Sequence, residues 1–268
     1  MKVVIIGPAY PLRGGLATFD QRLCKAFTDV GCDSSIYSFS LQYPGFLFPG
    51  TTQYTSDPPP EGLKIFSVIN SVNPLNWAVV GERLRKEAPD LIVVRYWLPF
   101  MGPALGTILG RVRKNKKTRI IAITDNVLPH EKRPGDRIFT RYFLKRCDGF
   151  ITMSDEVMQD LRTFEQTKPA RRVVHPLYDN FGPIISKSEA RKRLSENLHI
   201  TIGEEDKVIL FFGFIRKYKG LDLLLQAMAE PGIGEAKIRL LIAGEFYDRE
   251  QDYLDLIGQL EIKDRLIL

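Results

Sequence analysis

The sequence predicts an α/β protein built from doubly wound domains, in which parallel strands alternate with helices. Short β-branched runs alternate with amphipathic segments of helix length along most of the 268 residues. Several of the runs, such as residues 3–6 and 91–95, are continuously apolar, as expected for strands that are covered on both faces. Strands and helices that alternate in this way are typical of doubly wound sheets.

The first part of the chain carries most of these elements. Strands are expected at residues 3–6, 35–39, 64–67, 91–95, 120–124, 150–153 and 172–175. Helices are expected at residues 16–28, 76–86, 102–114, 137–146 and 155–164. Ser154, followed by two acidic residues, predicts a helix start, and Gly31 predicts the end of the first helix. Residues 40–62 contain five prolines and three glycines, which indicates a long loop.

A second domain is expected after a proline- and glycine-bounded connector at residues 176–183. We assign residues 1–180 to the first domain and residues 181–268 to the second. The second stretch predicts helices at 187–195, 221–228 and 249–260 and strands at 208–212 and 238–243, with a third strand starting near residue 266. Because a doubly wound domain usually needs about 100–200 residues, we expect this second domain to be incomplete.

Composition narrows the class of protein. Charged residues make up 26% and hydrophobic residues 44%, which is ordinary for a globular protein. The net charge of +6 suits anionic small molecules or an anionic membrane surface, and does not by itself indicate nucleic acid. Three cysteines without a CxxC spacing favour a reducing, cytoplasmic compartment, and neither they nor the three histidines have metal-ligand spacing. The first apolar run is too short for a signal peptide, and residues 96–110, the longest uncharged stretch, are too short to span a bilayer.

Two glycine-containing loops are candidate phosphate sites. Gly14 and Gly15 lie between the first strand and its helix, where bare backbone and helix N–H groups can face an anion. Their spacing is not GxGxxG, which disfavours a dinucleotide cofactor. A flexible turn is the alternative interpretation.

The second loop follows a strand at its carboxyl end. Gly213 ends an apolar run, and Arg216, Lys217 and Lys219 come before Gly220 and a helix. Ligands of open α/β sheets bind at such strand ends, where Arg216 can bind phosphate with its planar fork and Lys219 adds a point charge. A solvated basic loop is the alternative interpretation.

Residues 211–225 resemble the strand–loop–helix signature of the retaining GT-B glycosyltransferases of family 4. Lys219 falls on the lysine of that signature, whereas Phe214 occupies the position where an arginine is common, so Arg216 must take the arginine's role. The resemblance implies a GT-B fold, with two Rossmann-like doubly wound domains that face a cleft. It also implies that the donor diphosphate is bound by Arg216 and Lys219, together with Gly213 and the first glycine pair.

The resemblance covers nearly the whole chain and suggests further site residues. Residues 124–131 resemble the loop that faces the acceptor and the donor sugar; many relatives have a histidine where this chain has Asp125, and His130 is the nearest imidazole. Asp125 and His130 are therefore the candidate catalytic residues, with a loop histidine bonded to backbone as the alternative for His130. Gly244 and Glu245 resemble the strand end beside the nucleotide. The family's pair of glutamates eight residues apart is absent from these 268 residues, so we expect little turnover from this form.

A basic and aromatic helix is expected at residues 136–146, where Arg137, Arg141 and Lys145 recur every fourth residue. Together with the basic run 111–117, it could face a membrane surface. A solvated helix face is the simpler interpretation.

The resemblance implies an enzyme that transfers a sugar from a nucleotide-diphosphate sugar to an acceptor hydroxyl, and we expect no cofactor and no metal. Fixed cations would stabilise the departing diphosphate. Family resemblance implies retention of configuration and an acceptor that is a glycan or is linked to lipid, as in lipopolysaccharide or exopolysaccharide synthesis. We expect a cytoplasmic protein, with possible peripheral contact at the inner face of the membrane and no nucleic-acid partner. The alternatives are a catalytically inactive nucleotide-sugar-binding fragment and a sugar-nucleotide epimerase on a similar scaffold.

Overall fold

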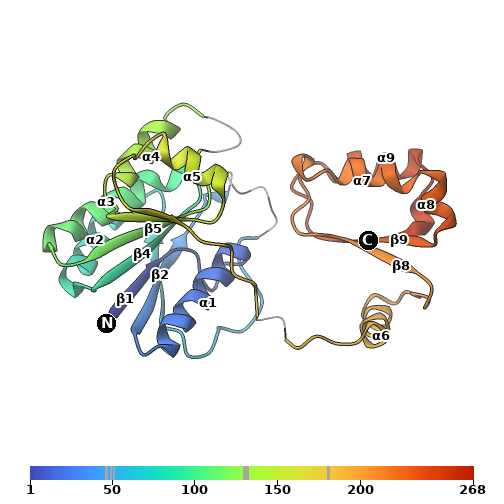
Figure 1. The fold of residues 1–268 in the computed structure, drawn as a ribbon, viewed down its shortest axis with the longest axis horizontal. Helices are drawn as coiled ribbons and strands as arrows, with labels where there is room; N and C mark the ends of the chain where they lie inside the picture. Colours follow the sequence, from blue (N-terminus) through green and yellow to red (C-terminus); the bar gives the residue numbers. More distant parts are fainter. Residues whose placement is uncertain (46–47, 49, 51, 129–132, 180–181) are drawn as a thin grey trace. The chain divides into compact units, whose positions relative to one another are not determined.

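The computed structural model describes residues 1–45, 48, 50, 52–128, 133–179 and 182–268 (Figure 1). The chain divides into two compact units. The first comprises Met1–Phe48 and Thr52–Tyr178, and the second consists chiefly of Asp179–Leu268. Each unit contains a parallel sheet with flanking helices, so the predicted α/β class is confirmed.

The first unit is built on a parallel sheet with the order β3-β2-β1-β4-β5-β6-β7 in the described part of the chain. Its strands are β1 (Lys2–Ile6), β2 (Asp33–Leu41), β3 (Ile65–Asn70), β4 (Leu91–Tyr96), β5 (Arg119–Thr124), β6 (Gly149–Thr152) and β7 (Ala170–Arg172). The chain first adds strands on one side of β1 and then continues from β4 on the other side. The carboxyl ends of β1 and β4 therefore form the switch point where doubly wound sheets bind their ligands.

Both faces of this sheet are covered, which explains the continuously apolar strands. The helices are α1 (Gly15–Asp29), α2 (Pro74–Glu87), α3 (Gly102–Val112), α4 (Asp136–Leu144) and α5 (Asp155–Arg162), and short 3-10 turns lie at Pro99–Met101 and Arg113–Asn115. Val3 and Ile5 belong to the core on the α1 side of the sheet. Val4 and Ile6 belong to the core formed with α2, α3 and α4, as the alternation of side chains along a strand requires.

The predicted helix ends are confirmed where the sequence carried a capping signal. The Ser154 hydroxyl accepts a hydrogen bond from the Val157 amide at 3.2 Å, and Gly31 has a φ of 82° just after α1. The last strand of this unit was predicted at the wrong place. It spans Ala170–Arg172 instead of residues 172–175, because the β-branched pair Val173 and Val174 is exposed beyond the sheet.

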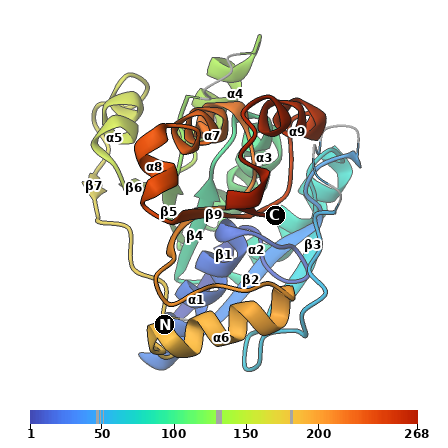
Figure 2. The ribbon, with the colours of Figure 1, turned by 90° about the vertical axis from the view of Figure 1, so that its right-hand side faces the viewer.

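The second unit contains a smaller parallel sheet with the order β10-β9-β8 in the described part of the chain. Its elements are α6 (Lys187–Leu198), β8 (Lys207–Phe212), α7 (Leu221–Met228), α8 (Pro231–Glu235), β9 (Ile238–Ala243), α9 (Glu250–Gln259) and β10 (Leu266–Ile267), with 3-10 turns at Lys217–Lys219 and Lys263–Arg265. The main core joins α7 and α9 to one face of the sheet, through residues such as Leu225, Ile242 and Ile257. Figure 2 shows α6 on the side of β9 opposite to α7 and α9. On that face, Leu194 of α6 packs with a smaller cluster around Leu241.

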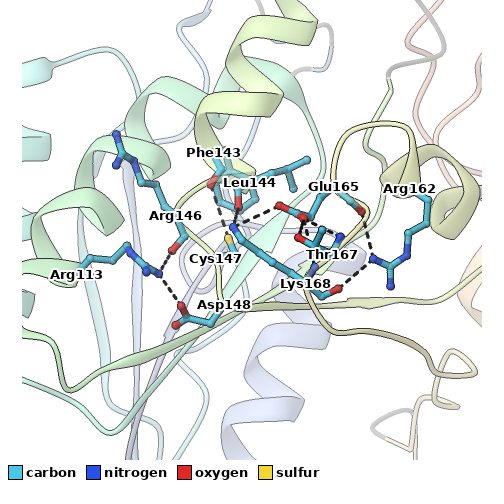
Figure 3. A network of polar contacts seen from close by, with 10 residues as sticks. All are labelled: Arg113, Phe143, Leu144, Arg146, Cys147, Asp148, Arg162, Glu165, Thr167 and Lys168. Atoms are coloured by element: carbon cyan, nitrogen blue, oxygen red, sulfur yellow. Dashed lines mark hydrogen bonds and ion pairs between the residues drawn. The ribbon is translucent and has the colours of Figure 1, made fainter.

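A polar network fixes the turn between α5 and β7 in the first unit (Figure 3). The Glu165 carboxylate accepts hydrogen bonds from the Thr167 amide at 3.0 Å, the Thr167 hydroxyl at 2.7 Å and the Lys168 amide at 3.2 Å. Lys168 in turn donates to the Leu144 carbonyl at the end of α4. Burial acts to raise the pKa of Glu165, but these hydrogen bonds and Lys168 outweigh it and lower the pKa to about 2.

We therefore predict that Glu165→Ala destabilises the protein by about 1–2 kcal/mol at pH 7, because two amides and a hydroxyl lose their acceptor. Since the folded-state pKa lies below its ordinary value of 4.5, this contribution is complete above that value and is lost as the pH falls toward 2. Urea unfolding at pH 7 and pH 3 measures it. Glu61→Ala, at an exposed loop position, is the control. A difference between Glu165→Ala and wild type that stays the same at both pH values would contradict the prediction.

Candidate functional site

Arg95 is a buried cation at the carboxyl end of β4, next to the switch point of the first sheet. Its Nε and Nη2 donate to the two carboxylate oxygens of Asp125, each at 2.6 Å. This is the bidentate pairing that a planar guanidinium makes with a carboxylate. Asp125 follows β5, and its amide donates to the Tyr96 carbonyl, so neighbouring strand ends place the two charges together.

A second carboxylate faces the same guanidinium. Asp20 of α1 lies with Oδ1 3.6 Å from Arg95 Nη1, and both side chains are almost fully buried. The Phe19 ring covers the guanidinium, with Arg95 Cζ 4.0 Å from the ring centroid. Gly7, just after β1, makes room for this arrangement, because a Cβ there would overlap the Asp20 carboxylate. Three elements, α1, β4 and the end of β5, therefore converge on one buried charge cluster.

The acids of this cluster have raised pKa values. Burial raises the pKa of Asp20 well above its usual range, and the Arg95 charge offsets only part of the effect. Burial also raises the pKa of Asp125, against the hydrogen bonds and charge of Arg95 and the charge of His175. Acids with perturbed pKa values at a strand edge are typical of functional sites.

The predicted glycine pair lies on the same unit. Gly14 has a φ of 107°, a conformation that favours glycine, and directly precedes α1. The Gly15 carbonyl accepts a hydrogen bond from the Tyr178 hydroxyl at 3.3 Å. Next to Tyr178, the His175 ring contacts the Phe19 ring edge to face, with centroids 5.5 Å apart. The segment after β7 thus packs against the start of α1.

The second unit carries the predicted cationic loop. Gly213 has a φ of 101° after β8, and Lys219 folds back over it, so that a Cβ on Gly213 would lie 3.4 Å from Lys219 Nζ. Gly220, with a φ of 73°, then starts α7. Arg216 Cζ lies 4.9 Å from the centroid of the Tyr247 ring. The two cations therefore belong to one short loop at the carboxyl edge of the sheet.

The loop after β9 is fixed against the loop after β8. The Gly213 amide donates to the Ala243 carbonyl at 2.9 Å, and the Ile215 amide donates to the Glu245 carbonyl at 2.8 Å. Gly244 is so close that a Cβ there would overlap the Gly213 carbonyl. A hollow of about 370 Å³ is lined by Gly244 and Glu245 together with Ile242, Phe246, Glu250, Leu254 and Leu268.

The structure brings Gly213, Arg216, Lys219, Gly244 and Glu245 together at one sheet edge, and it places Gly14, Gly15 and Asp125 on the first unit. His130 lies outside the described residues. Arg95 and Asp20 were not predicted as site residues. The arginine within the apolar run of β4 was a signal in the sequence, whereas the burial of Asp20 in α1 is visible only in the structure.

The described ranges contain no group of three or more His, Cys, Asp or Glu residues that could hold a metal ion. Among the same residues, every helix is too short or too polar to cross a membrane.

Comparison with known proteins identifies the family. The model of the family described as Glycosyltransferase Family 4 matches residues 13–179, which is more than half of the chain. The chain belongs to glycosyltransferase family 4. No match was found among curated proteins.

Solved structures agree with the GT-B fold expected for a family 4 glycosyltransferase. A glycosyltransferase from Rickettsia africae ESF-5 is similar with a TM-score of 0.66 and 14% identity, over 99% of this chain and 67% of that one. Anabaena Alr3699/HepE in complex with UDP and glucose has a TM-score of 0.64 and 16% identity, over 100% and 68%. The family 4 chain thus spans about two thirds of the length of these proteins.

An epimerase shares the architecture as well. The UDP-GlcNAc 2-epimerase from Methanocaldococcus jannaschii is similar with a TM-score of 0.55 and 11% identity, over 100% of this chain and 73% of that one. The fold alone therefore does not separate the two enzyme classes. The family match does, and it identifies this protein as a glycosyltransferase.

The contact between the loops of the second unit leads to a prediction for this glycosyltransferase. Gly244→Ala should destabilise it by about 1–3 kcal/mol, because the new methyl group must displace the Gly213 backbone. Gly258→Ala is the matched control, since a Cβ there meets open space within α9 and should be neutral or slightly stabilising. Thermal unfolding measures both. Equal melting temperatures for the two variants would contradict the close contact.

Proposed function

We propose that this family 4 glycosyltransferase transfers a sugar from a nucleoside diphosphate donor to an acceptor hydroxyl, with the diphosphate bound by the loop 213–220. One observation carries the proposal. Lys219 Nζ lies over Gly213, at a strand end where bare backbone and a positive side chain face the same space. Ligands of open α/β sheets bind beyond such strand ends, and phosphate suits backbone N–H groups combined with a cation.

The departing diphosphate sets the chemical requirement. Its negative charge grows as the bond to the sugar breaks, and fixed positive groups aimed at that charge lower the barrier. Lys219 would supply a point charge and Arg216 a planar fork for two phosphate oxygens. The Tyr247 ring beside Arg216 limits where the guanidinium can lie. In this proposal these two cations neutralise the charge without a cofactor or a metal, and the amides at Gly14 and Gly15 remain a separate candidate phosphate site on the first unit.

The hollow beside Gly244 and Glu245 is the proposed site for the nucleoside of the donor. It has apolar walls from Ile242 and Leu254 and acidic residues among its lining. Apolar walls with a few polar groups are the usual composition of a small-molecule site. An acidic side chain would accept hydrogen bonds from ribose hydroxyls.

On the first unit, we propose that the acceptor hydroxyl binds near Asp125, with His130 as a second candidate. Asp125 is the member of its charge cluster that reaches solvent, with 16% of its side chain exposed. A carboxylate there can accept a hydrogen bond from a hydroxyl group.

The biological acceptor is proposed to be a glycan or a lipid-linked sugar, in a pathway such as lipopolysaccharide or exopolysaccharide synthesis in the cytoplasm. The exposed Ile138, Phe139 and Tyr142 of α4, on a helix that also carries Arg137 and Arg141, support occasional contact with the inner face of a membrane. A nucleotide-binding protein without turnover and an epimerase are the alternatives. Product analysis with UDP-glucose separates them, because transfer or hydrolysis yields UDP and an epimerase yields an isomeric sugar nucleotide.

We predict that Lys219→Ala weakens nucleoside diphosphate binding at least tenfold, a loss of about 1.4 kcal/mol or more, because a cation–phosphate contact disappears. Lys217→Ala, in the same 3-10 turn, is the matched control and should change affinity less than about twofold. Isothermal titration with UDP, GDP and ADP measures both variants. A dissociation constant for Lys219→Ala equal to that of the wild type would contradict the assignment of residues 213–220 as the phosphate loop.

A further inference from the structure

We propose that Arg95 and Asp20 are positioning residues for Asp125, which they hold in one orientation toward the acceptor hydroxyl. This inference rests on the proposed function, because it gives Asp125 its role on the acceptor side. It goes further by naming two residues of α1 and β4 as parts of the acceptor site.

The solvent exposure of the three side chains increases from Asp20 and Arg95 to Asp125. Asp20 is 1% exposed, Arg95 is 2% exposed and Asp125 is 16% exposed. Asp125 is therefore the end of the cluster that a substrate can touch. Asp20 and Arg95 act only through it, because neither reaches the surface of its own unit.

The pairing of Arg95 with Asp125 fixes both the position and the rotation of the carboxylate. Two donors of a rigid fork reach two oxygens at 2.6 Å, so the carboxylate plane cannot turn without breaking a hydrogen bond. Each oxygen keeps a second lone-pair site, which remains for a hydroxyl donor. A fixed acceptor atom of this kind orients a nucleophile before the reaction.

Arg95 is itself fixed on the sides that Asp125 does not occupy. Asp20 faces Nη1 at 3.6 Å, and the Phe19 ring covers the guanidinium plane at 4.0 Å. Gly7 lets Asp20 approach, since any larger residue there would overlap its carboxylate. Buried ion clusters of this type are often no more stabilising than an apolar core, so a role in the site explains them better than stability does.

The charge balance of the cluster separates the roles of its two acids. One guanidinium faces two carboxyl groups, with His175 near Asp125 and Cys24 near Asp20. Asp125 has the hydrogen bonds that favour its charged form, whereas no hydrogen bond to either Asp20 carboxylate oxygen is found within the described part of the chain. Asp20 is therefore the acid of the pair that retains a proton to higher pH, and Arg95 favours the charged form of Asp125.

Carbon-13 NMR of the full chain, labelled at aspartate carboxyl groups, tests this arrangement without any assay of activity. Asp125→Asn and Asp20→Asn identify the two resonances. In Arg95→Met the pKa of Asp125 should rise by about 1–3, because the opposite charge is lost, and Arg95→Lys should restore part of the shift. Asp29→Asn, an exposed position on α1, should leave it unchanged.

Kinetics of UDP, GDP and ADP release from UDP-glucose, GDP-mannose and ADP-glucose provide the second readout. Arg95→Lys and Asp20→Ala should lower kcat about tenfold or more and leave donor affinity within about twofold, because the proposed donor-binding cations Arg216 and Lys219 belong to the second unit. Asp20→Asn, which keeps the shape of a protonated aspartate, should have a smaller effect on kcat than Asp20→Ala. Thermal unfolding of the same variants shows whether the first unit, which contains both substituted positions, stays folded. Loss of nucleotide binding in Lys219→Ala with these effects absent would overturn this inference alone. No nucleotide binding or release by the wild-type chain would overturn the proposed function and this inference with it.

Discussion

Parallel pairing of strands is the constraint on which the arrangement of this protein depends. A parallel strand can be followed only by a crossover, so every loop that leaves the carboxyl end of a strand lies on the same edge of its sheet. In the first unit this edge gathers the Gly14 loop, Arg95 and Asp125 from three different strand ends. In the second unit it gathers Gly213, Lys219 and Gly244. Parallel strand pairing alone therefore places residues that are far apart in sequence at the same sheet edge.

The carboxyl edges of the two sheets differ in how their charged side chains are arranged. In the first unit, opposite charges are withdrawn from water and must satisfy one another, which demands close geometry and gives rigidity. In the second unit, cations lie on a loop bracketed by glycines with positive φ, where a phosphate can compete for them. The proposed sugar transfer would use both properties, since one reactant must be oriented and the other must have its growing charge neutralised.

Much of the fold could be predicted from the sequence, because continuous apolar strands and capped helices are local signals. Residues such as Ser154 and Gly31 mark helix ends through interactions within one turn. The strand at Ala170–Arg172 was misplaced, because β-branched residues continue beyond the point where pairing with β6 stops. The candidate phosphate loop was recognisable because its glycines and cations are contiguous. The Asp20–Arg95–Asp125 cluster was not, because its members are 75 and 30 residues apart along the chain and meet only after the sheet forms.

The contact of Gly244 with Gly213 has a consequence for redesigning the proposed donor site. Since the backbone of one loop fills the space that a side chain of the other would need, the two loops form a single rigid wall. Mutations that reshape the hollow beside Glu245 will therefore also displace the neighbouring cationic loop. Changes that keep both glycines and vary the flanking positions together would preserve this backbone contact.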